Sequence, residues 1–467
     1  MNKKCQIFTP ENYVEELLDC INYSENIYNK KVLENACGDG NILINIVRRY
    51  ITDCIRQNLT KNQIQIGLSN DIYAYEIDKE YHRKCIINLN KILFENGLEK
   101  INWHIYNEDY LKSKTDIKFD YIISNPPYIT YKEISIMNRK FLKDNFFTCK
   151  KGKYDYCYAF IEKSLKNLRL NGKMSYLIPS SIFKVASGNL LRHLIKDNIV
   201  RIDDYTTQKL FDNALVASAV IVIDTSIDTT TILYNNIVDN SQSMINKNTL
   251  GERWVFKKIK NTGLKRFGDF FNVSHSIATL LNEAYVIKTW KDSKDYYLCD
   301  GYQIEKATVK EAAAPRRLAY GKKELIIFPY RYINGELKRY TENEFEQQFP
   351  QTTAFLNRLR VKLEKRNIDS HANWFEYGRS QALSSLNTEK VLLSTIITKK
   401  IKLYRLPKDC IPYAGVFIQQ KGYKYSLEDA VNILTSQNFL DYAYSVGINI
   451  NGISIRITSK DIKEYRF

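Results

Sequence analysis

Residues 119–128 read Phe-Asp-Tyr-Ile-Ile-Ser-Asn-Pro-Pro-Tyr, and this stretch decides the fold. The apolar run Phe119–Ile123 predicts a buried strand. The strand must end at the two prolines, because proline donates no N–H to a strand ladder and fixes its own φ. That end leaves a carboxamide (Asn125), a rigid carbonyl (Pro126) and an aromatic ring (Tyr128) close together. In an open α/β sheet, ligands bind at this carboxyl edge of the strands.

These three groups predict a site for the exocyclic amine of a flat substrate. Asn125 Oδ1 and the Pro126 carbonyl can both accept hydrogen bonds from an –NH₂ group. The Tyr128 ring can stack on the ring that carries this amine. We therefore assign catalysis to Asn125, Pro126 and Tyr128.

Strands and helices alternate through the first half of the chain. Apolar runs predict strands at 31–37, 72–77, 103–106, 119–123, 174–178, 200–205 and 217–223. Helical spacing of apolar residues predicts helices at 41–57, 156–170 and 188–197. This alternation indicates a doubly wound, Rossmann-like α/β domain with a mostly parallel sheet.

After about residue 245 the alternation gives way to short strands, many tyrosines and one long polar helix at 350–366. These features predict a mixed α+β domain. With a linker at 239–243, we expect a catalytic domain at 1–240 and a second domain at 245–467.

Composition narrows the class of protein. The chain has no run of 18 apolar residues that could span a membrane, and its nine cysteines are scattered as in a reduced cytoplasmic protein. Its five histidines form no metal-ligand cluster. Residues 1–250 hold 33 Lys and Arg against 29 Asp and Glu, whereas residues 251–467 hold 36 against 23. A near-neutral half beside a half with net charge +13 suggests a catalytic module beside a polyanion-binding one.

Acidic residues follow the first strands of the predicted sheet. Gly38-x-Gly40 opens a helix after the first strand, and its glycines allow a ligand to approach the backbone. Glu76 ends the second strand, where a carboxylate can accept hydrogen bonds from ribose hydroxyls. Asp109 follows the third strand and can accept from an adenine amine. The set predicts a nucleoside cofactor without a pyrophosphate.

Further motifs occur in a fixed order along nearly the whole chain. They are Phe8-Thr9-Pro10, Leu33-Glu34-x-Ala36-Cys37-Gly38-x-Gly40, Glu76-Ile77-Asp78, Asp109-Tyr110, Asn125-Pro126-Pro127-Tyr128, Gly152–Phe160, Lys209-Leu210-Phe211, Ser276–Leu280, Ile327–Tyr330 and Tyr377–Gln381. The ordered set resembles the gamma-class adenine-N6 DNA methyltransferases of restriction–modification systems.

The resemblance implies S-adenosylmethionine as the cofactor. Thr9, Glu34 and the backbone at Ala36 would hold its methionine end beside Gly38 and Gly40. Glu76 would bind the ribose and Asp109 the adenine amine. The residues implied to pack on the adenine faces are Ile77, Tyr110, Pro127 and Phe160. Phe211 is implied as a second aromatic contact of the target base beside Tyr128.

The expected activity is site-specific methylation of N6 of a flipped adenine in duplex DNA. Arg379 and Gln381 have side chains that can pair bidentately with base edges, and Arg316 and Arg317 are assigned to phosphate contacts, with solvated surface charges as the alternative. We expect a cytoplasmic monomer acting on double-stranded DNA beside a separately encoded cognate endonuclease, without a membrane partner. The alternative is an Asn-Pro-Pro-Tyr methyltransferase acting on RNA or protein glutamine. A fused nuclease is not expected, since the cofactor motif begins at Thr9.

Overall fold

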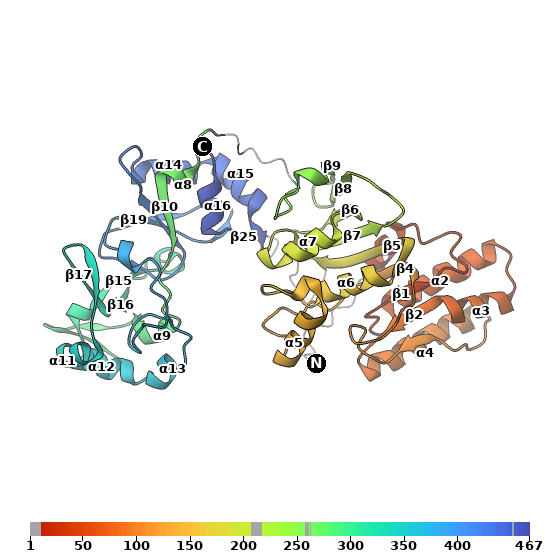
Figure 1. Ribbon diagram of the computed structural model, residues 1–467, viewed down its shortest axis with the longest axis horizontal. Helices are drawn as coiled ribbons and strands as arrows, with labels where there is room; N and C mark the ends of the chain where they lie inside the picture. The colour runs from red at the N-terminus through yellow and green to blue at the C-terminus, as the bar shows by residue number, and fades with distance from the viewer. Residues whose placement is uncertain (1–10, 207–216, 257–260, 262, 451–452) are drawn as a thin grey trace. The chain divides into compact units, whose positions relative to one another are not determined.

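The computed structural model describes residues 11–206, 217–256, 261, 263–450 and 453–467 (Figure 1). Thr9 and Phe211 therefore lie outside the described residues. The chain divides into two compact units, 1–258 with 448–453 and 259–447 with 454–467. Among the described residues, none of the helices is long and apolar enough to cross a membrane.

Within the described part of the N-terminal unit, nine strands form one sheet in the order β3-β2-β1-β4-β5-β7-β6-β8-β9. Neighbours from β3 to β5 pair in parallel, and β7 runs antiparallel to both β5 and β6. The strands are β1 Val32–Glu34, β2 Ile72–Tyr75, β3 His104–Tyr106, β4 Phe119–Ser124, β5 Leu168–Pro179, β6 Ile199–Asp204, β7 Ser218–Asp224, β8 Thr231–Asn236 and β9 Ser241–Asn246.

Helices cover both faces of this sheet. They are α1 Glu11–Asp19, α2 Asn41–Arg56, α3 Lys61–Asp71, α4 Lys79–Glu95, α5 Ile136–Asn145, α6 Cys157–Asn167 and α7 Asn189–Ile195. Successive residues of β1 belong to two different hydrophobic cores, one on each face of the sheet. Val32 belongs to the core with α1, α2 and α4, and Leu33 belongs to the core with α6 and α7. Because both faces are covered, strands such as β7 are buried along their whole length. The predicted doubly wound α/β fold is confirmed.

The C-terminal unit is built from small sheets and short helices. Its strands are β10 Phe271–His275, β11 Val286–Ile287, β12 Lys291–Asp292, β13 Tyr296–Cys299, β14 Tyr302–Glu305, β15 Val309–Ala313, β16 Glu324–Ile327, β17 Tyr330–Ile333, β18 Glu336–Arg339, β19 Lys390–Leu393, β20 Ile396–Thr398, β21 Leu403–Leu406, β22 Ile411–Pro412, β23 Val416–Gln420 and β25 Ser454–Arg456. Its helices are α8 Phe267–Phe270, α9 Asn282–Tyr285, α10 Pro315–Leu318, α11 Glu342–Gln348, α12 Pro350–Asn357, α13 Arg360–Glu364, α14 Leu427–Thr435, α15 Gln437–Val446 and α16 Ser459–Glu464. The larger sheets have the orders β10-β23-β19-β21 and β11-β16-β15-β22, so the predicted mixed α+β class is confirmed.

Two sequence-based assignments are wrong. The linker predicted at 239–243 is a turn that leads into β9, an antiparallel partner of β8 at the edge of the large sheet. The long helix predicted at 350–366 is divided into α12 and α13, because Leu359 leaves the helical conformation with φ −118° and ψ 16°.

The backbone at Gly40 generates our first prediction. Gly40 precedes α2 with φ 96°, and a Cβ there would lie 2.9 Å from Cys85 Sγ. We expect Gly40→Ala to lower the free energy of unfolding by about 1–2 kcal/mol, because L-residues are strained at positive φ. Urea denaturation measures the change. Gly251→Ala is the control, since its Cβ would meet no atom within 4 Å. An equal loss in both variants would contradict this account.

Candidate active site

One open cavity, about 960 Å³ with its mouth, lies at the carboxyl ends of β1 to β4. The strand order reverses between β1 and β4, and such a switch point is where open α/β sheets bind ligands. The predicted residues that line the cavity are Glu34, Ala36, Gly38, Glu76, Ile77, Asp109, Tyr110, Asn125, Pro126, Pro127, Tyr128 and Phe160. Gly40 is not among the lining residues and instead precedes α2.

Glu76 directly follows β2 and forms a hydrogen bond with the glycine-rich loop after β1, which contains Gly38 and Gly40. Its Oε2 accepts a hydrogen bond from the Gly38 N–H at 2.9 Å, and its Oε1 accepts one from the Asp78 N–H at 2.7 Å. Asp78 in turn caps α4 by accepting from the N–H groups of Glu80 and Tyr81. Burial raises the pKa of Glu76, and backbone hydrogen bonds from Asp78, Gly38 and Ile77 oppose this shift. Each carboxylate oxygen retains a lone pair for a ligand in the cavity.

Glu34 is a buried carboxyl group in the wall of the same cavity. Burial is the main cause that raises the pKa of Glu34 well above its usual value. Within the described part of the chain, its Oε2 has no hydrogen-bond partner. A buried polar atom without a partner costs stability, so its retention in a ligand cavity points to a cationic or hydrogen-bond-donating ligand.

Aromatic rings form one side of the cavity. Tyr110 lies 5.2 Å from Tyr75 and 5.8 Å from Phe160, measured between ring centroids, and Tyr156 lies 5.7 Å from Phe160. The sequence-based site omitted Tyr75 and Tyr156. Tyr156 could have been predicted from the sequence, because it precedes Phe160 by four residues and therefore lies on the same helix face.

The groups predicted to accept hydrogen bonds from the substrate amine follow β4 directly. Asn125 and Tyr128 are half-buried, and the Tyr128 hydroxyl is buried. Burial raises the pKa of Tyr128 well above its usual value, while the Ser218 hydroxyl acts in the opposite direction. The phenol therefore stays neutral, and its ring offers an uncharged surface for stacking.

A buried carboxamide joins the two strand ends of the switch point. The Ser124 hydroxyl donates to Asn35 Oδ1 at 2.8 Å, and Asn35 Nδ2 donates to Ser164 Oγ at 2.8 Å and to the Tyr176 hydroxyl. Asn35 follows β1, Ser124 ends β4, Ser164 lies on α6 and Tyr176 on β5. The network therefore sets the position of the residue after Ser124, which is Asn125.

The residues predicted to contact DNA lie in the C-terminal unit. Arg316 is exposed, whereas Arg317 forms an ion pair with buried Glu324 at 2.7 Å. Arg379 forms an ion pair with Asp369 at 3.3 Å, and Gln381 Nε2 donates to the Ser276 carbonyl at 3.3 Å. Their roles stay predictions.

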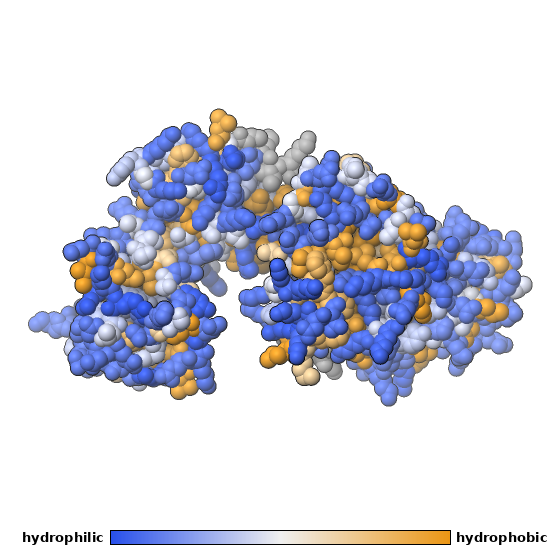
Figure 2. All heavy atoms as spheres, viewed as in Figure 1, coloured by the Kyte–Doolittle hydropathy of each residue, from blue (hydrophilic) through white to orange (hydrophobic). Residues whose placement is uncertain are grey.

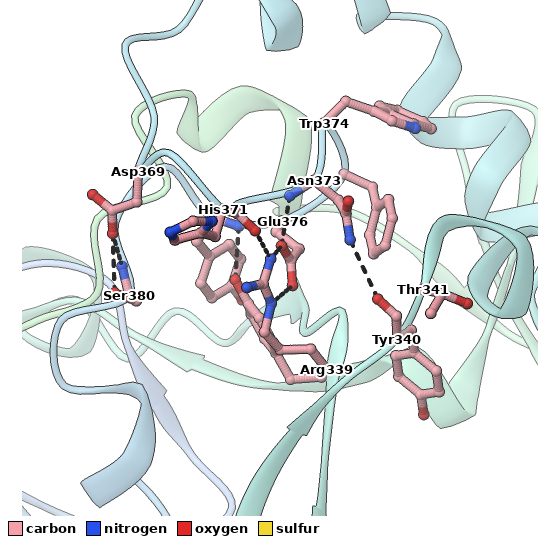
Figure 3. A network of polar contacts seen from close by, with 12 residues as sticks. Arg339, Tyr340, Thr341, Asp369, His371, Asn373, Trp374, Glu376 and Ser380 are labelled. Carbon is pink, nitrogen blue, oxygen red and sulfur yellow. Dashed lines mark hydrogen bonds and ion pairs between the residues drawn. The ribbon is translucent and has the colours of Figure 1, made fainter.

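Polar contacts hold the loop 369–381, which carries Arg379. Figure 3 shows Arg339 of β18 placed between Glu376 and His371 of this loop. Arg339 Nε donates to Glu376 Oε1 at 2.7 Å, and the Ser380 N–H donates to Asp369 Oδ2 at 2.8 Å. The loop is thus held at several points around Arg379.

Comparisons with known proteins find relatives among restriction-modification methylases. Residues 43–211 match the Eco57I restriction-modification methylase family. The chain is 22% identical to the type II restriction enzyme and methyltransferase RM.Eco57I from Escherichia coli, over 97% of this chain and 53% of that protein. It is 30% identical to the type II methyltransferase M.BstVI from Geobacillus stearothermophilus, over 47% of this chain and 42% of that protein. The resemblance expected from the motifs is confirmed, and the chain spans about half the length of these relatives.

Two solved structures share the fold across both units. The restriction-modification enzyme MmeI in complex with DNA superposes with a TM-score of 0.63 at 12% identity, over 97% of this chain and 64% of MmeI. The DrdV–DNA complex gives a TM-score of 0.56 at 12% identity, over 92% of this chain and 51% of that chain. At this identity the likeness concerns the fold alone.

The Asn35 network generates a second prediction. Ser124→Ala removes one donor and leaves Asn35 Oδ1 buried without it. We expect a loss of about 1–3 kcal/mol in the free energy of unfolding, measured by urea denaturation. Ser243→Ala, at an exposed serine of β9, should change it by less than about 0.5 kcal/mol. A Ser124→Ala variant as stable as the wild type would show that the network carries little energy.

Proposed function

Because residues 43–211 carry the methylase region of the Eco57I restriction-modification family, we propose that this chain methylates N6 of an adenine in duplex DNA. The methyl donor is S-adenosylmethionine, and the role is that of a modification enzyme. One observation carries the proposal. A single cavity is lined both by the carboxyl groups at the ends of β1, β2 and β3, which are Glu34, Glu76 and Asp109, and by the groups after β4 that can accept hydrogen bonds from an amine.

The residues of the cavity fit S-adenosylmethionine, which supplies an electrophilic methyl group when bound. Glu34 Oε2, which has no partner in the described part of the chain, suits the ammonium of the methionine end. Glu76 suits the ribose hydroxyls and Asp109 the adenine amine. Ile77, Pro127 and the Tyr110–Phe160 ring pair supply apolar faces for the adenine.

Asn125 and Pro126 activate the target amine by accepting hydrogen bonds from it. The lone pair of adenine N6 is delocalised into the ring, so the free amine is a poor nucleophile. Asn125 Oδ1 and the Pro126 carbonyl hold both N6 protons in a geometry that localises the lone pair toward the methyl donor. No base is needed before the attack, because N6 becomes acidic only once it is methylated. The proton then leaves to solvent.

The adenine has to leave the duplex before it can enter this cavity. Flipping costs a few kcal/mol, and stacking on an aromatic side chain returns about 1–3 kcal/mol per base. Tyr128 supplies that stacking surface. Phe211 is proposed as the second aromatic contact and lies outside the described residues.

The C-terminal unit is proposed to bind the DNA and choose the site. Residues 251–467 hold 36 Lys and Arg against 23 Asp and Glu, so the region attracts phosphates. Arg379 and Gln381 are proposed to contact base edges, and Arg316 and Arg317 to contact phosphates. For Arg317 and Arg379, binding would compete with the ion pairs to Glu324 and Asp369. The proposed partners are duplex DNA and a cognate endonuclease on a separate chain, with the protein acting as a cytoplasmic monomer.

A methyltransferase acting on RNA or protein glutamine is the alternative. Transfer of tritiated methyl groups to duplex DNA, RNA and a peptide release factor, measured side by side, separates the two proposals. We expect label in DNA only. Unlabelled DNA beside labelled RNA or protein would overturn the proposal.

Asn125 provides the sharpest test of the chemistry. Asn125→Ala should lower the rate of DNA methylation by about 10²–10³-fold, because one of the two preorganised acceptors is removed. Cofactor binding, measured by calorimetry, should persist. Asn102→Ala, at an exposed asparagine of the same unit, serves as the control. Near-normal methylation by Asn125→Ala would refute the mechanism.

The raised pKa of Glu34 predicts a pH dependence of cofactor binding. The free protein holds a proton on this buried carboxyl group to a higher pH than an exposed glutamate does. A bound ammonium lowers the pKa of Glu34, so the complex holds fewer protons and cofactor affinity rises with pH. Calorimetric titration from acidic to neutral pH measures this dependence. The slope should flatten in Glu34→Gln, and a slope that survives the substitution would assign it to another group.

A further inference from the structure

Residues 129–153, here called the tip segment, connect two parts of the chain that line the cavity. The segment begins after Tyr128 and ends before Tyr154, and both Tyr128 and Tyr156 line the cavity. The Tyr156 N–H donates to the Ile129 carbonyl at 2.9 Å, which joins the two ends. The segment therefore starts and finishes beside the amine-accepting site, and α5 lies between these ends (Figure 1).

The tip segment concentrates the positive charge of the catalytic half. It holds seven Lys and Arg against two Asp and Glu, whereas the other residues of 1–250 hold 26 against 27. Its exposed lysines are Lys132, Lys140, Lys143, Lys150, Lys151 and Lys153. Among the described residues, these six amines form no ion pair within 4.0 Å. Their charge is thus available to an anionic partner.

Two large apolar side chains stand beside these lysines. Ile136 and Met137 are 82% and 83% exposed at the start of α5, while Leu142 of the same helix is buried. Figure 2 shows hydrophobic side chains at the surface over α5. Among the described residues, Ile136 and Met137 are the only two large apolar side chains that are adjacent in sequence and each more than 80% exposed. Single exposed apolar residues are ordinary, whereas an adjacent pair within a cationic segment suggests a binding function.

The segment around the pair is not loosely held. The Ser135 hydroxyl accepts from the Asn138 N–H and caps α5. The Arg139 guanidinium stacks on the Tyr131 ring at 4.3 Å and donates to the Tyr131 carbonyl at 3.0 Å. The Tyr154 hydroxyl donates to the Arg139 carbonyl at 2.8 Å. Ile136 and Met137 are therefore exposed on a helix that is anchored beside the cavity.

We propose that the tip segment grips the duplex at the flipped adenine, which deepens and rests on the proposed function. Its lysines bind phosphates next to the target nucleotide, and Ile136 and Met137 insert into the base stack that the adenine has left. Duplex DNA fits both features, since it presents phosphates outside and apolar base faces where a nucleotide has left the stack. Exposed Ile and Met side chains are among those that insert between base steps, and lysines supply the sequence-independent affinity.

The lysines are tested by the salt dependence of DNA binding. Lys140→Gln/Lys143→Gln/Lys150→Gln is compared with Lys30→Gln/Lys100→Gln, two exposed lysines of the same unit outside the segment. The probe is a short duplex carrying the adenine that the wild type methylates, located by sequencing the reaction product. The plot of log K against log salt has a negative slope, and its magnitude should decrease by about 0.9 for each phosphate that the variant no longer neutralises. The control should keep the wild-type slope.

The apolar pair is tested by base flipping. In Ile136→Ser/Met137→Ser, the fluorescence gain of 2-aminopurine at the target position and the methylation rate should both fall about tenfold. The salt slope should stay unchanged. A duplex with an abasic site opposite the target should restore the rate, because flipping then costs less. Leu170→Ser, at a residue 81% exposed on β5, is the control, and thermal unfolding verifies that every variant is folded.

The outcomes separate this inference from the proposed function. If the wild type methylates DNA and both tip-segment variants match it in salt slope and flipping, the inference alone fails. If the apolar variant instead changes the sedimentation of the protein without DNA, the pair is a self-association surface and the inference also fails. If the wild type transfers no methyl group to DNA but binds S-adenosylmethionine, the proposed function fails first.

Discussion

The hydrogen bonds of Asn35 determine how the two halves of the cavity meet. The carboxamide accepts from Ser124 at the end of β4 and donates to Ser164 of α6 and Tyr176 of β5. Adjacent parallel strands alone set only the register of β1 against β4. The hydrogen bonds of the Asn35 side chain also fix where the glycine-rich loop leaves β1 and where the turn with Asn125 leaves β4. Because the methyl donor and the target amine have to meet within one cavity, this placement is a condition for the proposed chemistry.

The same region carries features that oppose stability. Glu34 and Glu76 are buried carboxyl groups with raised pKa values, and Gly38 and Gly40 adopt positive φ angles. A fold selected for stability alone would replace a buried carboxyl such as Glu34, whose Oε2 has no hydrogen-bond partner among the described residues, with an apolar group. Such departures are expected where a site is built for a ligand. Here they cluster at the ends of β1 and β2, on one side of the switch point.

Much of the N-terminal unit could be predicted from sequence, because its central strands are buried on both faces and appear as continuous apolar runs. The end of β4 and the acidic strand ends were predictable for the same reason, since polar residues follow each run. The edge strand β9 was missed because five of its six residues are exposed and it lacks an apolar pattern. The break at Leu359 was missed because the helical spacing of apolar residues continues across it. Tertiary pairings such as Arg317 with Glu324 and Arg379 with Asp369 leave no trace in local sequence.

The central claim is that this cavity methylates adenine N6 in duplex DNA at a defined site. Expression of the chain in a host without DNA methylation, followed by sequencing that detects modified bases, tests it most directly. We expect N6-methyladenine at one position of one recurring sequence throughout the genome. A genome without N6-methyladenine, despite folded protein that binds S-adenosylmethionine, would contradict it.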